Sequence, residues 1–105
     1  MYKVIVFAGT TEGYEISRFL GENQIPVLAC VATEYGSKSL KESSTLHVQA
    51  GRLDEKEMKE LFSREKPELV LDATHPYAAE VTRNIRKACE EAEVSYTRIL
   101  RTDAI

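Results

Sequence analysis

Several features that mark particular classes of protein are scarce in this 105-residue chain. It has two cysteines, three prolines and no tryptophan, and charged residues interrupt it too often for an apolar run of about 18 residues that could span a membrane. The N-terminus has no basic segment followed by a long apolar stretch, so we expect no secretory signal. Lys and Arg (14) are outnumbered by Asp and Glu (17), which argues against nucleic-acid binding because phosphates need clustered positive charge. We therefore expect a cytoplasmic protein that binds neither membranes nor nucleic acid.

The two cysteines show no spacing typical of a disulfide framework or a metal site. Cys30 lies in an apolar run and Cys89 in an amphipathic one, with no CxxC pair and no neighbouring histidine. We expect both to pack as small buried hydrophobic residues, and we expect no metal.

Short apolar runs alternate with amphipathic segments along the whole chain. Expected strands, rich in β-branched residues, occupy residues 3–7, 27–32, 46–49, 68–71 and 95–100. The helices between them have apolar residues at helical spacing: Ile16, Phe19 and Leu20; Met58, Leu61 and Phe62; and Ala78, Val81, Ile85, Ala88, Cys89 and Ala92. We expect residues 33–36 to form a loop and residues 37–44 a short helix or turn, while Asp54 and Glu57 resemble a capping box. The alternation predicts one Rossmann-like α/β domain over residues 1–105, with a five-stranded parallel sheet in the flavodoxin-like order 3-2-1-4-5 and helices on both faces.

The turn after the first strand has the composition of a phosphate site. This first segment (residues 9–13) consists of Gly9, Thr10, Thr11, Glu12 and Gly13. Glycines permit tight backbone geometry there, and the free N–H groups at a helix N-terminus favour a phosphate. The spacing is not G-x-G-x-x-G, so a purely structural turn is the alternative.

A second segment (residues 33–36) follows the second strand and contains Thr33, Glu34, Tyr35 and Gly36. In a Rossmann fold an acid at this point holds a ribose hydroxyl of the cofactor, and Glu34 is in position to do so. An ordinary surface glutamate is the alternative. Such an acid disfavours a 2′-phosphate, although Arg52 or the rest of the segment could still accommodate one.

The third segment (residues 72–77) is the most specific and follows the fourth strand. It places a carboxylate, a hydroxyl and an imidazole close together in the run Asp72, Ala73, Thr74, His75, Pro76 and Tyr77. Ligands of open α/β sheets bind beyond the carboxyl ends of the strands, where the first and third segments should face each other. In the simpler interpretation, Asp72 or Thr74 caps the next helix and His75 accepts a backbone hydrogen bond. Arg101 could meet an anionic substrate at the same edge, whereas we expect His47 to be a structural or exposed strand residue.

Taken together, these segments resemble the N-terminal half of the precorrin-6A reductase family, also called cobalt-precorrin-6A reductases. The likeness spans essentially all 105 residues and is most specific in the run from Asp72 to Ala78. The first glycine of the family's frequent Gly-Gly-Thr start is Ala8 here. The resemblance implies an NADPH- or NADH-dependent oxidoreductase that reduces a double bond of a precorrin or cobalt-precorrin macrocycle in cobalamin biosynthesis.

The resemblance also implies roles for the three segments. Residues Gly9, Thr10, Thr11, Glu12 and Gly13 would approach the cofactor phosphates, Thr33, Glu34, Tyr35 and Gly36 the adenosine, and Asp72, Ala73 and Thr74 the nicotinamide. His75, Pro76, Tyr77 and Arg101 would meet the macrocycle, with His75 as a candidate catalytic acid. The family's second domain would be supplied in cis or in trans, and we expect this domain to be inactive alone. A non-catalytic nucleotide-binding module is the alternative. A signalling receiver domain is excluded, because this chain lacks the acidic cluster that such a domain needs.

Overall fold

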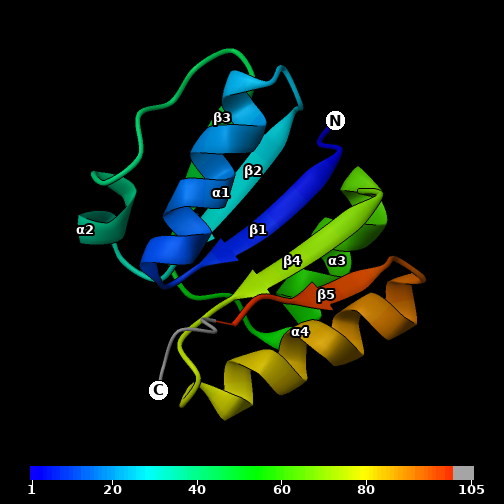
Figure 1. Ribbon diagram of the computed structural model, residues 1–105. Coiled ribbons are helices and arrows are strands. Elements are labelled where there is room, and N and C mark those ends of the chain that lie inside the picture. Colours follow the sequence, from blue (N-terminus) through cyan, green and yellow to red (C-terminus); the bar gives the residue numbers. More distant parts are fainter. Residues whose placement is uncertain (101–105) are drawn as a thin grey trace.

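The computed structural model describes residues 1–100, in which five strands form one parallel sheet (Figure 1). The strands are β1 Val4–Ala8, β2 Val27–Val31, β3 Leu46–Ala50, β4 Leu69–Ala73 and β5 Tyr96–Arg98. Their order is β3-β2-β1-β4-β5, and every neighbouring pair is parallel. The predicted α/β fold and strand order are therefore confirmed, although β5 is shorter than expected.

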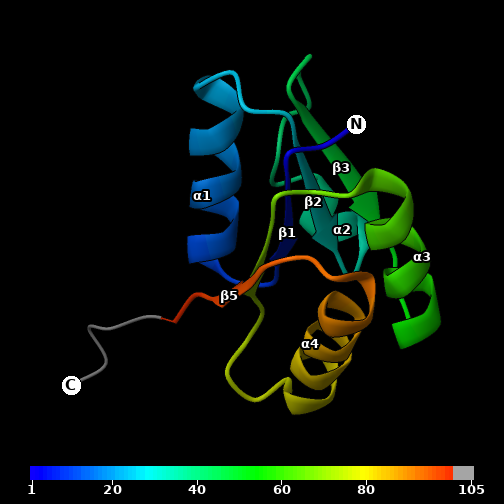
Figure 2. The ribbon, with the colours of Figure 1, turned by 90° about the vertical axis from the view of Figure 1, so that its right-hand side faces the viewer.

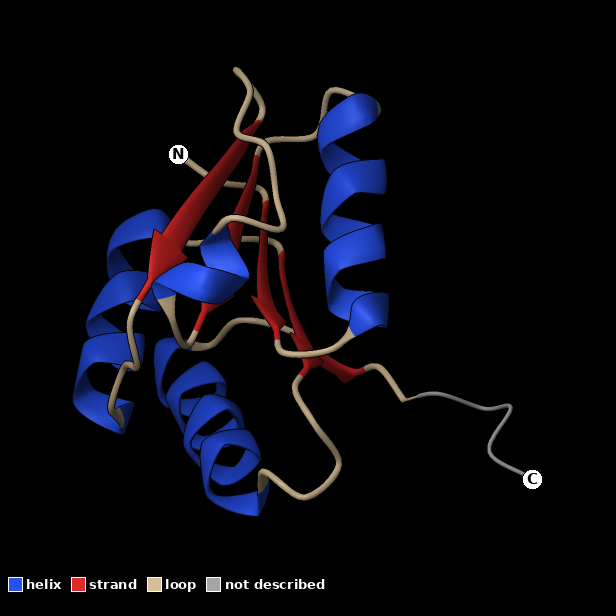
Figure 3. Cartoon of the chain, turned by 90° about the vertical axis from the view of Figure 1, so that its left-hand side faces the viewer, coloured by secondary structure: helices blue, strands red, loops and turns tan. Residues whose placement is uncertain are grey.

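Helices cover both faces of this sheet, as the alternation predicted. They are α1 Thr11–Glu22, α2 Glu34–Ser37, α3 Glu55–Glu65 and α4 Ala79–Ala92. Figures 2 and 3 show α1 on one face, with α3 and α4 together on the other. Within residues 1–100, no helix is long and apolar enough to cross a membrane.

Each face of the sheet has its own apolar core. Since successive strand residues point to opposite faces, β1 directs Ile5 and Phe7 toward α3 and α4, and Val4 and Val6 toward α1. Phe7 meets Phe62 of α3 edge-on at 6.0 Å between ring centroids. All five residues of β1 and of β2 are buried, which explains why these strands are continuous apolar runs.

The expected buried face of α1 is partly wrong. Phe19 is 60% exposed, and the buried residues of α1 are Gly13, Ser17 and Gly21, spaced four apart. Ser17 donates a 2.7 Å hydrogen bond to the carbonyl of Gly13, which satisfies its buried hydroxyl. This stripe of small residues lets α1 lie close to the sheet, so the larger apolar side chains flank the contact or point away from it.

The connection from β2 to β3 also differs from the prediction. Residues 33–36 do not form a loop, because Thr33 caps the one-turn helix α2 by accepting a 3.2 Å hydrogen bond from the N–H of Gly36. Ser37 continues the turn by donating to the carbonyl of Glu34 at 2.7 Å. Of the short helix or turn expected over residues 37–44, the structure has the end of α2 at Ser37 and a turn at residues 38–39, and the rest of the polar stretch that leads to β3 is irregular.

Helix capping follows the sequence for α3 but not for α4. Asp54 accepts from the N–H of Glu57 at 2.7 Å and the Glu57 carboxylate accepts from the N–H of Asp54 at 2.9 Å, so the predicted capping box is confirmed. Helix α4 begins after Ala78 without a side-chain cap. Neither Asp72 nor Thr74 caps it, because both belong to a network at the end of β4.

Candidate functional site

The first and third segments lie against each other at the carboxyl edge of the sheet. The N–H of Gly9 donates to the carbonyl of Ala73 at 3.3 Å, and the hydroxyl of Thr10 donates to the same oxygen at 2.8 Å. A Cβ on Gly9 would lie 3.4 Å from the Cα of Thr74. The predicted adjacency of these two segments, which follows from the pairing of β1 with β4, is confirmed.

Gly13 brings the start of α1 close to both strands. A Cβ at this position would lie 2.8 Å from the Cα of Ala8 and 3.0 Å from the Cβ of Ala73. The third glycine of dinucleotide-binding turns performs this packing role, allowing the helix to approach the strand. Gly13 therefore shapes the site through packing, and any larger side chain there would push α1 away from the sheet.

The first turn of α1 uses one threonine internally and leaves another exposed. The hydroxyl of Thr10 donates to Ala73 and also accepts from the N–H of Gly13 at 3.4 Å, so it caps the helix. Thr11, the first helical residue, is exposed, and its N–H is one of those that a helix leaves without an intrahelical partner. Thr11 is therefore the threonine able to meet an anion at this helix start.

Residues of the second segment lie at the carboxyl ends of β2 and β3. Glu34 is exposed as the first residue of α2, and it lines a hollow of about 330 Å³ with Ser37 and Lys38. Gly36 is buried, and a Cβ on it would lie 3.0 Å from the hydroxyl of Tyr14 and 3.3 Å from the Cβ of Val31. The glycine thus allows α2 to pack against both α1 and β2, which places Glu34 at the rim.

Asp72 is the centre of a buried polar network that the sequence alone did not predict. Its side chain is fully buried, and Oδ1 accepts from Arg98 Nη1 at 2.9 Å and from the Thr74 hydroxyl at 2.6 Å. Oδ2 accepts from the Thr82 hydroxyl and the Tyr96 hydroxyl, both at 2.8 Å. One carboxylate therefore joins the end of β4 to α4 and to β5.

The protonation states in this network follow from its hydrogen bonds. Burial on its own raises the pKa of a carboxyl group, but hydrogen bonds from Thr74, Tyr96 and Thr82 outweigh it and lower the pKa of Asp72. Burial, followed by the hydrogen bond to this carboxylate, raises the pKa of Tyr96, whose phenol stays a donor. Asp72 is thus a carboxylate that positions its neighbours, and both of its oxygens have hydrogen-bond partners within the chain.

The rest of the third segment is exposed. His75, Pro76 and Tyr77 all lie on the surface, with Tyr77 89% exposed and its ring 5.1 Å from that of His75 between centroids. The N–H of Tyr77 donates to His75 Nδ1 at 3.2 Å, which is the backbone hydrogen bond expected in the simpler interpretation. Because Nδ1 accepts, a neutral His75 has its proton on Nε2. The ring therefore presents a donor away from the backbone.

The cysteines and His47 lie in the environments that the sequence predicted. Cys30 and Cys89 are buried, as expected, and burial raises the pKa of each thiol to about 12. His47 is exposed on β3 and its Nδ1 lies 2.8 Å from the Tyr2 hydroxyl, in agreement with a structural role. No group of His, Cys, Asp and Glu within residues 1–100 could hold a metal ion. Arg101 lies outside the described residues.

Comparison with known proteins decides the family. A family model described as precorrin-6x reductase CbiJ/CobK matches residues 3–105. The chain belongs to this family. The family resemblance inferred from the sequence is thereby confirmed.

Curated relatives and a solved structure agree with this membership. The chain is 37% identical over 103 residues to a cobalt-precorrin-6A reductase of Methanothermobacter thermautotrophicus, covering 97% of this chain and 34% of the relative. It is 32% identical over 102 residues to the Salmonella typhimurium cobalt-precorrin-6A reductase, covering 97% of this chain and 38% of the relative. The structure of CobK precorrin-6A reductase superposes with a TM-score of 0.81 at 25% identity, over 97% of this chain and 40% of that one.

The Bordetella bronchiseptica enzyme WbmH, solved in complex with NAD+, shares the fold. Its TM-score is 0.72 at 19% identity, over 90% of this chain and 36% of that one. The chain spans between 34% and 40% of the length of the family members compared above.

Proposed function

We propose that this chain is the N-terminal, cofactor-binding half of a reductase that transfers hydride from NADPH or NADH to a double bond of a precorrin-6A or cobalt-precorrin-6A macrocycle in cobalamin biosynthesis. Its family membership supports the reaction class. The observation that supports the site is the contact of Gly9 and Thr10 with Ala73, which joins the first and third segments where ligands of open α/β sheets bind.

The residues of the first segment fit the phosphates of a dinucleotide. Thr11 presents its hydroxyl and a helix N-terminal N–H, and the positive end of the α1 dipole favours a negative charge there. Gly9 has no side chain to obstruct a ligand, and Gly13 holds the helix start against the strands. We assign the backbone of Gly9, Thr10, Thr11, Glu12 and Gly13 to the phosphates, with Thr11 supplying the available hydroxyl.

The remaining cofactor contacts follow from the order of the strands. Thr33, Glu34, Tyr35 and Gly36 follow β2 and would meet the adenosine, while Asp72, Ala73 and Thr74 end β4 and would meet the nicotinamide. Asp72 would act through Thr74, because its own oxygens are occupied. The reduced nicotinamide supplies the hydride, and this chain supplies binding and orientation.

The exposed part of the third segment would face the macrocycle. His75 presents Nε2–H as a donor, and Pro76 and Tyr77 add apolar surface beside it. We propose His75, Pro76, Tyr77 and Arg101 as the substrate side of the cleft, with His75 as the candidate proton donor. A loss of roughly 10- to 100-fold in turnover on His75→Ala would fit a hydrogen-bonding role.

We further propose that residues outside this chain, in cis or in trans, supply the second wall of the cleft. Hydride transfer needs donor and acceptor carbons held about 3.5 Å apart, and one wall does not enforce that distance. The chain alone should therefore give no loss of NADPH absorbance with precorrin-6A. Steady oxidation of NADPH by the isolated chain would contradict this part of the proposal.

Calorimetric titration of NADPH into a Thr11→Asp variant tests the phosphate site. A carboxylate at the first position of a helix does not weaken the helix, so the fold should be retained while the phosphates are repelled. We expect affinity to fall about tenfold, the effect of roughly 1.4 kcal/mol of repulsion. Ser44→Asp is the matched control, since Ser44 is an exposed residue before β3, at the opposite edge of the sheet. Equal NADPH affinity in the two variants would refute the phosphate site.

A further inference from the structure

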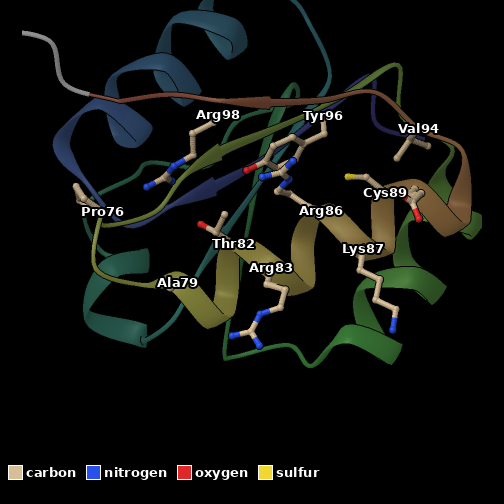
Figure 4. Close-up of a pocket in the computed structure, with 11 residues that line it drawn as sticks. Pro76, Ala79, Thr82, Arg83, Arg86, Lys87, Cys89, Val94, Tyr96 and Arg98 are labelled. Atoms are coloured by element: carbon tan, nitrogen blue, oxygen red, sulfur yellow. The ribbon is translucent and has the colours of Figure 1, made fainter.

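A groove that the sequence did not indicate runs between α4 and β5. Its volume is about 760 Å³, and it begins beside Pro76 of the third segment and continues along α4 (Figure 4). Tyr96 of β5 forms part of its wall, and Thr82 lies on the facing helix. The groove is therefore continuous with the proposed substrate side of the cleft.

Arginines gather in the half of the groove nearer Pro76. Arg98 extends from β5 and Arg86 extends from α4 toward Tyr96, whereas Arg83 lines the groove from α4 with its guanidinium directed away from β5 (Figure 4). Lys87 and Glu90 line the other half, and Lys87 Nζ forms an ion pair with Glu55 Oε2 at 3.7 Å. The excess of positive charge is thus local to one half, in a chain whose net charge is −3.

Two of these arginines are held in place by groups that leave guanidinium N–H donors available. Arg98 uses Nη1 for the carboxylate and carbonyl of Asp72 and for the Thr74 hydroxyl, and its side chain is 20% exposed. The guanidinium of Arg86 lies 5.7 Å from the centre of the Tyr96 ring, a cation–π contact. A pre-positioned guanidinium loses little freedom when it binds an anion.

Arg83 and Arg86 have no ionic partner in the described part of the chain. Among residues 1–100, the ion pairs of the structure include neither Arg83 nor Arg86. Both residues are exposed, so their guanidinium groups are accessible to an anion in solution. The planar fork of each guanidinium matches a carboxylate in particular.

We infer that Arg86 and Arg98, together with Arg83 at the outer rim of the groove, bind carboxylate side chains at one edge of the macrocycle. This inference rests on the proposed function, because it places the substrate ring against His75 and Pro76, where the groove begins. Precorrins have acetate and propionate side chains around the ring, so an edge that enters the groove brings carboxylates to the three arginines. The groove would thereby set which edge of the ring faces the cofactor.

The test compares two corrin rings that differ in their side chains. Cobyrinic acid has free carboxylates and cobinamide has amides in most of those places, so each is titrated into the 15N-labelled 105-residue chain. We expect cobyrinic acid to shift the amide resonances of residues 82–86 and 98 in a saturable way, and cobinamide to bind at least tenfold more weakly. Equal affinity for both rings, shifts confined to other residues, or no binding of cobyrinic acid at millimolar concentration would each overturn the inference.

Variants locate the effect and separate it from the cofactor site. Arg83→Gln removes an exposed charge, and the double variant Arg83→Gln, Arg86→Gln should lower the affinity for cobyrinic acid at least tenfold. Arg64→Gln on α3 is the matched control, since its guanidinium is exposed and lies outside the groove. Unchanged affinity in the double variant would overturn the inference, as would a hexaglutamate peptide that binds more tightly than cobyrinic acid.

NADPH titration of the double variant distinguishes the two proposals. Retained NADPH affinity together with lost cobyrinic acid binding would support a carboxylate site in the groove and would agree with the proposed cofactor site. Cobyrinic acid binding by a chain that does not bind NADPH would support the groove and refute the proposed function.

Discussion

Arg98 and Asp72 are paired both through the backbone and through their side chains. They are directly opposite each other in the register of β5 and β4, and Arg98 Nη1 lies 2.9 Å from Asp72 Oδ1. The same carboxylate accepts hydrogen bonds from Thr74, Thr82 and Tyr96. This pair therefore fixes the end of β4, from which the exposed His75, Pro76 and Tyr77 project.

Replacing Asp72 by Asn should destabilise the chain strongly. The amide leaves Arg98 without its ionic partner and offers one acceptor oxygen in place of two, so we expect the free energy of unfolding to fall by roughly 3 kcal/mol. Urea unfolding measures this change. Asp54→Asn is the matched control, because asparagine caps a helix about as well as aspartate and should change stability little. Equal stability of the two variants would contradict the network's role.

The same comparison should depend on pH. Since the folded state has the lower pKa for Asp72, the carboxylate contributes stability fully above the unfolded value of about 3.9, and this contribution is lost as pH falls through the folded pKa. The difference in unfolding free energy between the original chain and Asp72→Asn should therefore be largest near about pH 6 and shrink below about pH 4. A difference that stays constant from neutral pH to about pH 2.5 would contradict an ionised Asp72.

Gly13 and Gly9 should respond differently to the same substitution. Alanine favours a helix over glycine by about 1 kcal/mol, yet at Gly13 its Cβ would lie 2.8 Å from the backbone of Ala8. We expect Gly13→Ala to lower the free energy of unfolding by roughly 1–3 kcal/mol, the usual effect of overpacking. At Gly9 the nearest contact would be an ordinary 3.4 Å, so Gly9→Ala should be nearly neutral. A Gly13→Ala variant as stable as Gly9→Ala would contradict the packing role.

Glu34 should influence which nicotinamide cofactor binds better. An exposed carboxylate at the rim of β2 can accept from a ribose hydroxyl of NADH but repels the 2′-phosphate of NADPH. Glu34→Gln should therefore raise the affinity for NADPH relative to NADH by about tenfold, measured by calorimetry with both cofactors. Glu60→Gln, an exposed glutamate on α3, is the control. The same affinity ratio in both variants would exclude Glu34 from the ribose site.

The sheet could be predicted because its signals are local. Apolar runs that alternate with amphipathic segments indicate right-handed crossovers, and the order 3-2-1-4-5 brings the first and third segments together. The exposure of Phe19 could not be predicted from helical periodicity, since α1 contacts the sheet through Gly13, Ser17 and Gly21. Small residues are weak signals in an apolar pattern, although their spacing of four was visible.

The partners of Asp72 were harder to predict. Tyr96 and Arg98 are distant in sequence, and their contacts with Asp72 depend on the register of β5 against β4. The Thr82 hydroxyl contacts the carboxylate because the third segment brings the start of α4 close to the end of β4. The signal available in the sequence was a lone aspartate at the end of an apolar strand, with an arginine in the neighbouring expected strand.

Mapping NADPH on the 15N-labelled chain by NMR is the most direct test of the central claim, that this domain binds the cofactor at the carboxyl edge of its sheet. We expect saturable shifts in the amide resonances of residues 9–13, 33–36 and 72–77, with residues 24–26 and 43–45 at the opposite edge unchanged. Shifts confined to that opposite edge, or no shifts at millimolar NADPH, would contradict it.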